Sequence, residues 1–232
     1  MHSTFRLIMH RYFIYLAYDG INYHGWQIQA NATTVQGLVN KALSTILNTP
    51  TETIGAGRTD TGVPAKQYIA HFDYEADLPY IPEKTVYNLH GILPNDIVIE
   101  GILKADNSFH ARFDAVSRTY KYLICPKKNP FMQELSYQLF SALNIDAMNQ
   151  AAETLLNYND FTSFSKLHSD MKTNKCTVTE AFWSQGPGNR LIFTITANRF
   201  LRNMVRAIVG TLLEVGKNKI NTILDIINRQ YV

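Results

Sequence analysis

The sequence predicts an α+β fold built from two similar halves. Segments rich in aromatic and β-branched residues alternate with amphipathic helical segments, and both halves place these elements in the same order. The chain of 232 residues, 46% of them apolar, is long enough to bury two cores. No stretch reaches the roughly 18 uninterrupted apolar residues of a membrane span, so we expect no membrane association.

The first half follows the order strand, helix, strand, strand, helix, strand. Residues 12–18 are rich in aromatic and branched side chains and predict the first strand. Apolar residues within 35–47 recur at intervals of three and four and predict a helix. Thr33 or Thr34 would cap its start, and Pro50 follows its end. The remaining elements are strands near 52–56, 67–74 and 97–103 and a short helix after Pro82.

The second half repeats this order up to its second helix. Its predicted elements are a strand at 119–124, a helix from Asn144 or Asp146, a hairpin of strands 177–184 and 190–197 about Gly186-Pro187-Gly188, and a helix at 200–215. This order is the split β-α-β unit of ferredoxin-like domains, used twice, with mainly antiparallel sheets. We place the two domains at residues 1–106 and 107–232.

A complete split β-α-β unit has a fourth strand after its second helix. After residue 215 the apolar residues Ile220, Ile223, Leu224 and Ile227 indicate one more short helix instead. We therefore expect the closing strand of the second domain to be missing from the chain.

Charge is distributed unevenly, although the net charge is only +3. Residues 69–110 are mainly acidic, whereas 112–128 and 166–219 are mainly basic. A solvated charged face is the simplest interpretation of each run, yet an asymmetry of this size favours one surface that meets a polyanion such as nucleic acid. Cys125 and Cys176 lack metal-ligand spacing, and a single disulfide would be unusual support for a core of this size, so we expect a reduced, cytoplasmic protein.

The predicted helix at 200–215 brings three arginines toward one edge. At about 100° per residue, Arg199, Arg202 and Arg206 fall close together beside the apolar stripe, with Gly210 one turn further on. They could form a solvated basic face. Among the three, Arg206 is best placed to reach inward and pair with a carboxylate.

The most informative segment is the loop at residues 57–63, which holds Arg58 and Asp60 between glycines. The glycines disfavour a regular helix or a central strand, and predicted strands flank the segment. Asp60 is therefore expected on a tight loop, where a side chain can face a bound molecule. A polar turn capped by Thr59 and Asp60 would explain the same residues without any chemistry.

Seven groups of residues, in order from about residue 12 to residue 217, resemble the tRNA pseudouridine synthase A family. They are AYDG with YHGWQ at 17–27, TVQG at 34–37, GAGRTDTGV at 55–63, FHARFDA at 109–115, RTYKY at 118–122, DFTSF at 160–164 and FLRNMVR at 200–206. Each group alone is a weak signal, but seven in order are specific.

The resemblance implies a function and a set of site residues. Asp60 would be the essential aspartate, Arg206 its basic partner, Tyr120 the tyrosine that contacts the target base, and Arg58 the arginine that holds the base or its vacated place. The implied reaction converts uridine to pseudouridine at positions 38–40 of the tRNA anticodon arm. The implied protein is a homodimer without a cofactor, in which two ferredoxin-like domains surround a basic cleft that Arg199 and Arg202 would help to line.

Two departures from the family pattern bear on activity. Pro64 stands where the family usually has a histidine, which stiffens the loop and removes a polar contact. The chain also stops at Val232, before the family's closing strand. These departures keep open an RNA-binding paralogue with impaired catalysis.

The residue types suit the implied chemistry, which needs neither a redox change nor a group donor. An ionised Asp60 could act as a nucleophile or as a base, and we take the nucleophile as the working assignment. A glycoside hydrolase is a distant alternative, because it needs a second carboxylate and Asp60 has no evident partner of that kind. Trp26, Phe161 and Phe164 are expected to pack in the core, and the histidines show no metal-ligand pattern.

Overall fold

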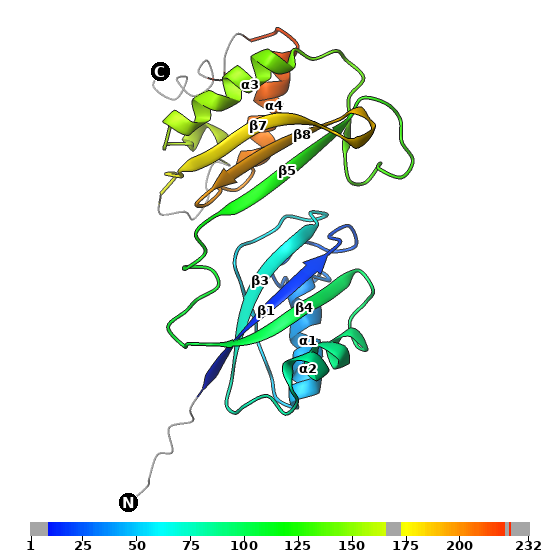
Figure 1. Cartoon of the computed structure of the whole chain (residues 1–232), viewed down its shortest axis with the longest axis vertical. Helices are drawn as coiled ribbons and strands as arrows, with labels where there is room; N and C mark the ends of the chain where they lie inside the picture. The colour runs from blue at the N-terminus through cyan, green and yellow to red at the C-terminus, as the bar shows by residue number, and fades with distance from the viewer. Residues whose placement is uncertain (1–8, 166–172, 221–222, 224–232) are drawn as a thin grey trace, which may run out of the picture. The chain divides into compact units, whose positions relative to one another are not determined.

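The computed structural model describes residues 9–165, 173–220 and 223. The chain divides into two compact units, residues 1–115 and 116–232, and each has its own sheet and its own hydrophobic core (Figure 1).

The first unit is a four-stranded antiparallel sheet with two helices. The strands are β1 (His10–Tyr18), β2 (Ile54–Gly55), β3 (Ala65–Tyr74) and β4 (Ile97–Ala105), and the helices are α1 (Val35–Leu47) and α2 (Pro82–His90). The sheet order is β2-β3-β1-β4, and every neighbouring pair is antiparallel. Alternate residues of β1, Tyr12 to Tyr18, are buried with the apolar faces of both helices in one core.

Helix α1 begins and ends where the sequence predicts. The hydroxyl of Thr34, the N-cap residue, accepts a hydrogen bond of 3.3 Å from the amide of Gly37. Asn48 ends the helix in the left-handed conformation, which asparagine tolerates well.

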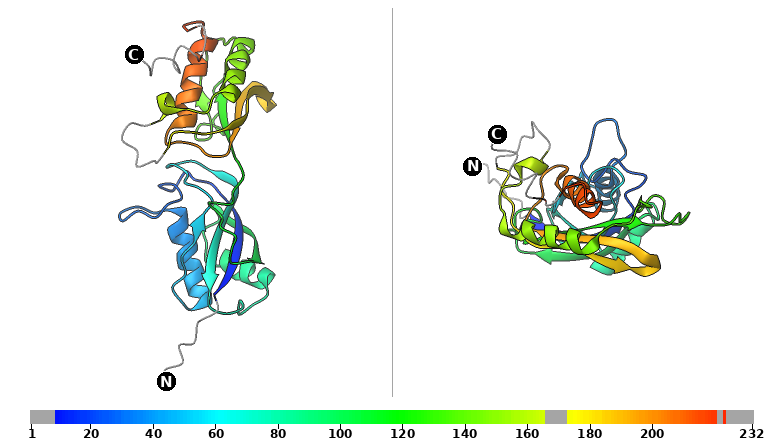
Figure 2. Two further views of the ribbon diagram at one scale, coloured as in Figure 1. Left: turned by 90° about the vertical axis from the view of Figure 1, so that its left-hand side faces the viewer. Right: turned by 90° about the horizontal axis from the view of Figure 1, so that it is seen from above.

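The second unit has a four-stranded sheet of order β6-β5-β8-β7, seen from two further sides in Figure 2. Its elements are β5 (Arg118–Cys125), β6 (Tyr137–Gln138), α3 (Ile145–Glu153), β7 (Val178–Gly186), β8 (Arg190–Ala197) and α4 (Met204–Gly216), with 3₁₀ turns η1 (Thr154–Asn157), η2 (Thr162–Phe164) and η3 (Pro187–Asn189). Strand β6 is the exception to the antiparallel pattern, because it pairs in parallel with the last two residues of β5.

The described residues thus form an α+β protein with two mainly antiparallel sheets and four α-helices, as predicted, and this arrangement is compatible with ferredoxin-like folds. The predicted helix at residues 220–227 and the question of a closing strand fall largely outside the described residues. Ile223, which is described, is buried in the core of the second unit.

Helix α4 starts four residues later than predicted. Asn203 precedes it with a φ of +67°, in the left-handed region, so Phe200 and Leu201 lie in the approach to the helix. Arg199 and Arg202 therefore do not share a helix face with Arg206, and the prediction of a single basic edge was wrong in this respect. Arg206 alone lies in the first turn of α4.

The aromatic residues expected in the cores are buried there. Trp26 belongs to the core of the first unit, and Phe161 and Phe164 belong to the core of the second. Cys125 and Cys176 are also buried, and both are free thiols.

His71 on β3 links the sheet of the first unit to the segment at residues 109–115. Its side chain is 1% exposed, and its Nδ1 atom accepts a hydrogen bond of 3.1 Å from the amide of Ala111. Nε2 is buried without a partner among the described residues. Burial, with the nearby Arg11 guanidinium, lowers the pKa of His71 to about 4, so this imidazole is neutral at pH 7.

The free energy of unfolding of the first unit should fall as His71 is forced to take a proton. Because the folded pKa is near 4 and the unfolded pKa near 6.5, the unfolded chain binds more protons between these values, and stability is lost as the pH falls through this window. The predicted loss is on the order of 3 kcal/mol.

Urea unfolding at several pH values tests this prediction in a Trp183→Phe background, where Trp26 reports on the first unit alone. His71→Asn is the control, since its side-chain carbonyl can accept from Ala111 but does not titrate. The difference in unfolding free energy between the two proteins should shrink from pH 7 to pH 4. Parallel curves would contradict the assignment.

Candidate active site

Asp60 lies at the tip of the loop that joins β2 to β3. The amide of Val63 donates to the carbonyl of Asp60 over 3.2 Å, which closes a tight turn. Gly62 is the third residue of this turn and has a φ of +78°, as a type II turn requires. The side chains of Arg58 and Asp60 are both exposed. Arg58 and Asp60 therefore face solvent from a loop whose backbone is held in a tight turn, as the sequence predicts.

Residues 18–26, which begin at the last residue of β1, form a cradle for this loop. The amide of Trp26 donates to the carbonyl of Thr59 over 3.3 Å, and the amide of Gly62 donates to the carbonyl of Tyr23 over 3.2 Å. The hydroxyls of Tyr18 and Thr59 are 2.9 Å apart and share a hydrogen bond. The aspartate loop is thus held at several points by backbone distant in sequence.

Two glycines make this close approach possible. A Cβ atom on Gly20 would lie 2.1 Å from the carbonyl oxygen of Val63, and one on Gly25 would lie 2.3 Å from that of Thr59. Gly25 also has a φ of +82°, which favours glycine. The AYDG and YHGW motifs are therefore the complementary surface of the aspartate loop.

An aromatic cluster supports the base of the loop. The rings of Trp26 and Tyr68 lie 4.3 Å apart, and Tyr18 packs against both. The hydroxyl of Tyr68 donates to the carbonyl of Gly57, next to Arg58. Gly55 leaves room for this cluster, because a Cβ atom there would lie 2.2 Å from the Tyr68 hydroxyl. Two tyrosine hydroxyls thus fix the loop on either side of Arg58.

The cradle is tied in turn to the start of β4. The buried hydroxyl of Tyr23 donates to the carboxylate of Asp96, and the backbone carbonyl of Asp96 accepts from the amide of Asp19 over 2.9 Å. Burial raises the pKa of Tyr23, and the hydrogen bond to Asp96 raises it further. Tyr23 therefore stays protonated and keeps its role as a donor.

The second unit gathers a different set of predicted residues. Tyr120 lies half-buried on β5 and meets the ring of Phe200 edge-on, with centroids 5.1 Å apart. Arg206 donates to the side-chain carbonyl of Asn203, which precedes its helix. Burial raises the pKa of Tyr122, two residues further along β5, and the positive charge of Arg206 acts in the opposite direction.

The predicted site residues thus divide between the units. Arg58 and Asp60 share the loop of the first unit, and Tyr120 and Arg206 belong to one region of the second. Arg199 and Arg202 lie in the segment between β8 and α4, with Arg202 exposed. Sequence reasoning missed the supporting tyrosines Tyr18 and Tyr68, although the glycines of the AYDG and YHGW motifs could have indicated a backbone that another segment approaches closely.

Within the described part of the chain, no group of three or more His, Cys, Asp or Glu residues could hold a metal ion. None of the helices described there is long and apolar enough to cross a membrane.

Comparison with known proteins defines the class. The family model described as tRNA pseudouridine synthase matches residues 151–229. The tRNA pseudouridine synthase A of Bacteroides fragilis is 54% identical over 211 residues, which cover 91% of this chain and 83% of the relative. The Porphyromonas gingivalis protein of the same name is 50% identical over 225 residues, or 96% and 89% of the two chains. That of Clostridium acetobutylicum is 42% identical over 207 residues, or 88% and 84%.

These identities, which extend over most of both chains, confirm the resemblance that the sequence motifs indicate. The chain belongs to the tRNA pseudouridine synthase A family.

Loss of the two tyrosine hydroxyls should loosen the aspartate loop. In Tyr18→Phe and Tyr68→Phe, each ring remains but one hydrogen bond to the loop is lost, worth about 1 kcal/mol. Local opening should therefore become about fivefold more frequent in each variant. Hydrogen exchange of the amides of Gly62 and Val63 measures it.

Tyr12→Phe is the matched control, because Tyr12 lies at the other end of β1 and its hydroxyl faces Ala76 and Asp77. Its loop amides should exchange at the wild-type rate. Equal loop protection in all four proteins would show that the hydroxyls do not hold the loop.

Proposed function

We propose that this protein converts uridine to pseudouridine at positions 38–40 of the tRNA anticodon arm. The observation that carries the proposal is the position of Asp60, at the tip of a loop held by the AYDG and YHGW motifs, in a chain 54% identical to a tRNA pseudouridine synthase A. No specific observation favours the RNA-binding paralogue without catalysis.

The reaction breaks the bond between N1 of uracil and C1′ of the ribose, turns the base, and joins C5 to C1′. The hydrogen at C5 leaves as a proton, and another proton is taken up at N1, so atoms and electrons balance without an oxidant or a cofactor. Asp60 acts as the nucleophile in this proposal. A base role would use the same ionised carboxylate.

Asp60 must stay ionised when a uridine displaces the water around it. An uncompensated carboxylate in a dry site takes up a proton instead, whereas a neighbouring cation favours the charged form. We assign this role to Arg206. Its position in the first turn of α4 adds the positive end of the helix to its own charge, so this part of the second unit attracts an anion strongly.

Tyr120 and Arg58 bind the target base in the proposal. The edge-on contact with Phe200 holds the Tyr120 ring in place, and its hydroxyl can offer a hydrogen bond. Arg58 lies two residues before Asp60 on the same loop and can fill the space that the base leaves in the helical stack. Arg199 and Arg202 bind the RNA backbone.

The remaining elements of the proposal concern assembly. Two ferredoxin-like domains, for which the sequence predicts the bounds 1–106 and 107–232 and the structure gives units 1–115 and 116–232, surround a basic cleft in this proposal, and the protein works as a homodimer in the cytoplasm without a cofactor. The family resemblance supports these elements. The uneven distribution of charge along the sequence agrees with a polyanionic substrate.

Asp60→Asn should abolish isomerisation and leave tRNA affinity within about twofold of wild type, because affinity comes mainly from phosphate contacts. Release of tritium from tRNA labelled at C5 of uridine measures the reaction, and a filter-binding titration measures affinity. Asp77→Asn, which removes another exposed carboxylate, is the control and should react normally. Substantial turnover by Asp60→Asn would refute the assigned role.

Arg206→Gln should lower the single-turnover rate at saturating tRNA by about a hundredfold, because the ionised carboxylate of Asp60 loses the cation assigned to it. Arg206→Lys should restore part of the rate, since it keeps the charge. Arg202→Gln is the control, because it should weaken binding without changing the saturated rate. A wild-type saturated rate in Arg206→Gln would separate Arg206 from Asp60.

A further inference from the structure

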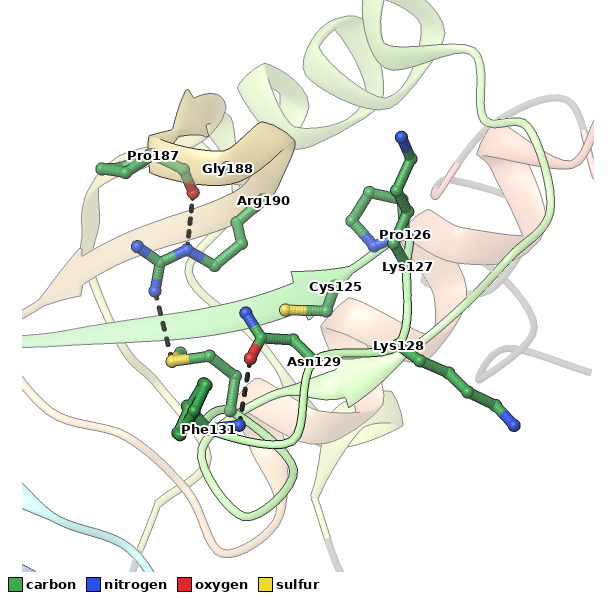
Figure 3. Close-up of a pocket in the computed structure, with 10 residues that line it drawn as sticks. Cys125, Pro126, Lys127, Lys128, Asn129, Phe131, Pro187, Gly188 and Arg190 are labelled. Atoms are coloured by element: carbon green, nitrogen blue, oxygen red, sulfur yellow. Dashed lines mark hydrogen bonds between the residues drawn. The ribbon is translucent and has the colours of Figure 1, made fainter.

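A hollow of about 450 Å³ opens in the second unit, away from the residues assigned to chemistry (Figure 3). The loop that follows β5 forms one wall, and the turn η3 between β7 and β8 forms the other. Tyr120 lies on the same strand, five residues before Cys125 at the rim. At about 3.3 Å per residue, the hollow is about 16 Å along β5 from Tyr120.

Arg190 spans the two walls of the hollow. Its Nε atom donates to the carbonyl of Pro187 over 2.7 Å, and its Nη1 atom lies 3.5 Å from the sulfur of Met132 (Figure 3). A thioether is a weak acceptor, so the guanidinium is held in position while much of its donor capacity is left for a ligand. A fixed, planar guanidinium suits phosphate recognition.

Lys127 and Lys128 add two charges at the rim. Both are exposed, and their side chains leave the loop in different directions (Figure 3). Neither lysine, nor Arg190, has a carboxylate within 4 Å among the described residues, whereas Arg11 and Lys104 each pair with one. The one acid of the loop, Glu134, does not line the hollow. Three cations without local compensation favour an anionic ligand.

Phe131 gives the hollow an aromatic surface. Its side chain is 89% exposed, which is unusual for a phenylalanine, yet its backbone is fixed. The amide of Phe131 donates to the side chain of Asn129 over 3.0 Å, and the amide of Met132 donates to the carbonyl of Asn129 over 3.2 Å. Exposed aromatic rings beside cations are the pattern with which proteins bind single-stranded nucleic acid, because a base stacks on the ring.

We propose that this hollow is a second contact site for the tRNA substrate. Lys127, Lys128 and Arg190 bind backbone phosphates, and a base of an unpaired stretch stacks on Phe131. This inference rests on the proposed function for the identity of the RNA. The site supplies affinity and register for the strand that carries the target uridine, and it takes no part in the chemical step.

The experiment measures the dissociation constant of unmodified tRNA over a series of salt concentrations, together with the single-turnover rate at saturating tRNA. Lys127→Ala/Lys128→Ala is compared with Lys41→Ala/Lys84→Ala, which removes two exposed lysines from the helices of the first unit. Each lost phosphate contact reduces the log–log salt slope by roughly 0.7 to 0.9. The first variant should bind about tenfold more weakly with a slope lower by roughly 1.4 to 1.8, and the control should match wild type.

Phe131→Ala separates stacking from charge. It should weaken binding about tenfold with the salt slope unchanged, because stacking releases no counterions. The saturated rate should be normal in all variants, and thermal unfolding should show that they are folded. Equal affinities and slopes for the two double-lysine variants would overturn the proposal, and would be the result if an acidic protein or a second copy of this chain occupied the hollow.

The binding measurement tests the contact site, and the pseudouridine measurement tests the proposed reaction, so either proposal can be refuted while the other stands. If wild type binds tRNA through Lys127 and Lys128 but forms no pseudouridine, the proposed reaction is wrong and the contact site stands. If pseudouridine forms and the lysine and phenylalanine variants bind like wild type, the reaction stands and the contact site is refuted.

Discussion

The close contact between residues 18–26 and the loop at residues 57–63 is the constraint on which the candidate site depends. Gly20 and Gly25 let the two backbones approach closely, and the hydroxyls of Tyr18 and Tyr68 fix the loop on either side of Arg58. Because the Tyr18 and Tyr68 rings are also part of the core of the first unit, the position of Asp60 is determined by packing rather than by the loop's own conformational preference. The backbone that carries Asp60 is thereby held as firmly as that of a residue in a sheet, although Asp60 lies on a loop.

The second unit contributes charge at a cost to its own stability. A cation in the first turn of a helix opposes the helix dipole, and Arg206 occupies that position in α4, whose first turn contains no acid. Lys127 and Lys128, which have no carboxylate within 4 Å among the described residues, add local repulsion of their own. Binding of an anion relieves the repulsion between these lysines, which agrees with a polyanionic substrate.

Local signals in the sequence predicted the fold well. Helix α1 was located correctly because its period of 3.6 and its cap Thr34 are both local. The start of α4 was placed four residues early because its apolar stripe continues through Phe200, and only the left-handed backbone of Asn203 interrupts it. Strand β6 was missed, since two residues carry no periodicity. The hydroxyls that hold the aspartate loop were also missed, because a tyrosine such as Tyr18, which meets the hydroxyl of Thr59 41 residues away, leaves no local pattern.

The two kinds of interaction suit two different tasks. Phosphate contacts bind the tRNA equally well before, during and after isomerisation, so they lower the concentration needed for binding without lowering the chemical barrier. They can nevertheless offset the few kcal/mol needed to remove a uridine from its stack. Only groups that touch the reacting atoms can favour the transition state, and their placement must then hold to a fraction of an ångström. A rigidly held Asp60 and a broad set of exposed cations are therefore what a base-isomerising enzyme on a large RNA requires.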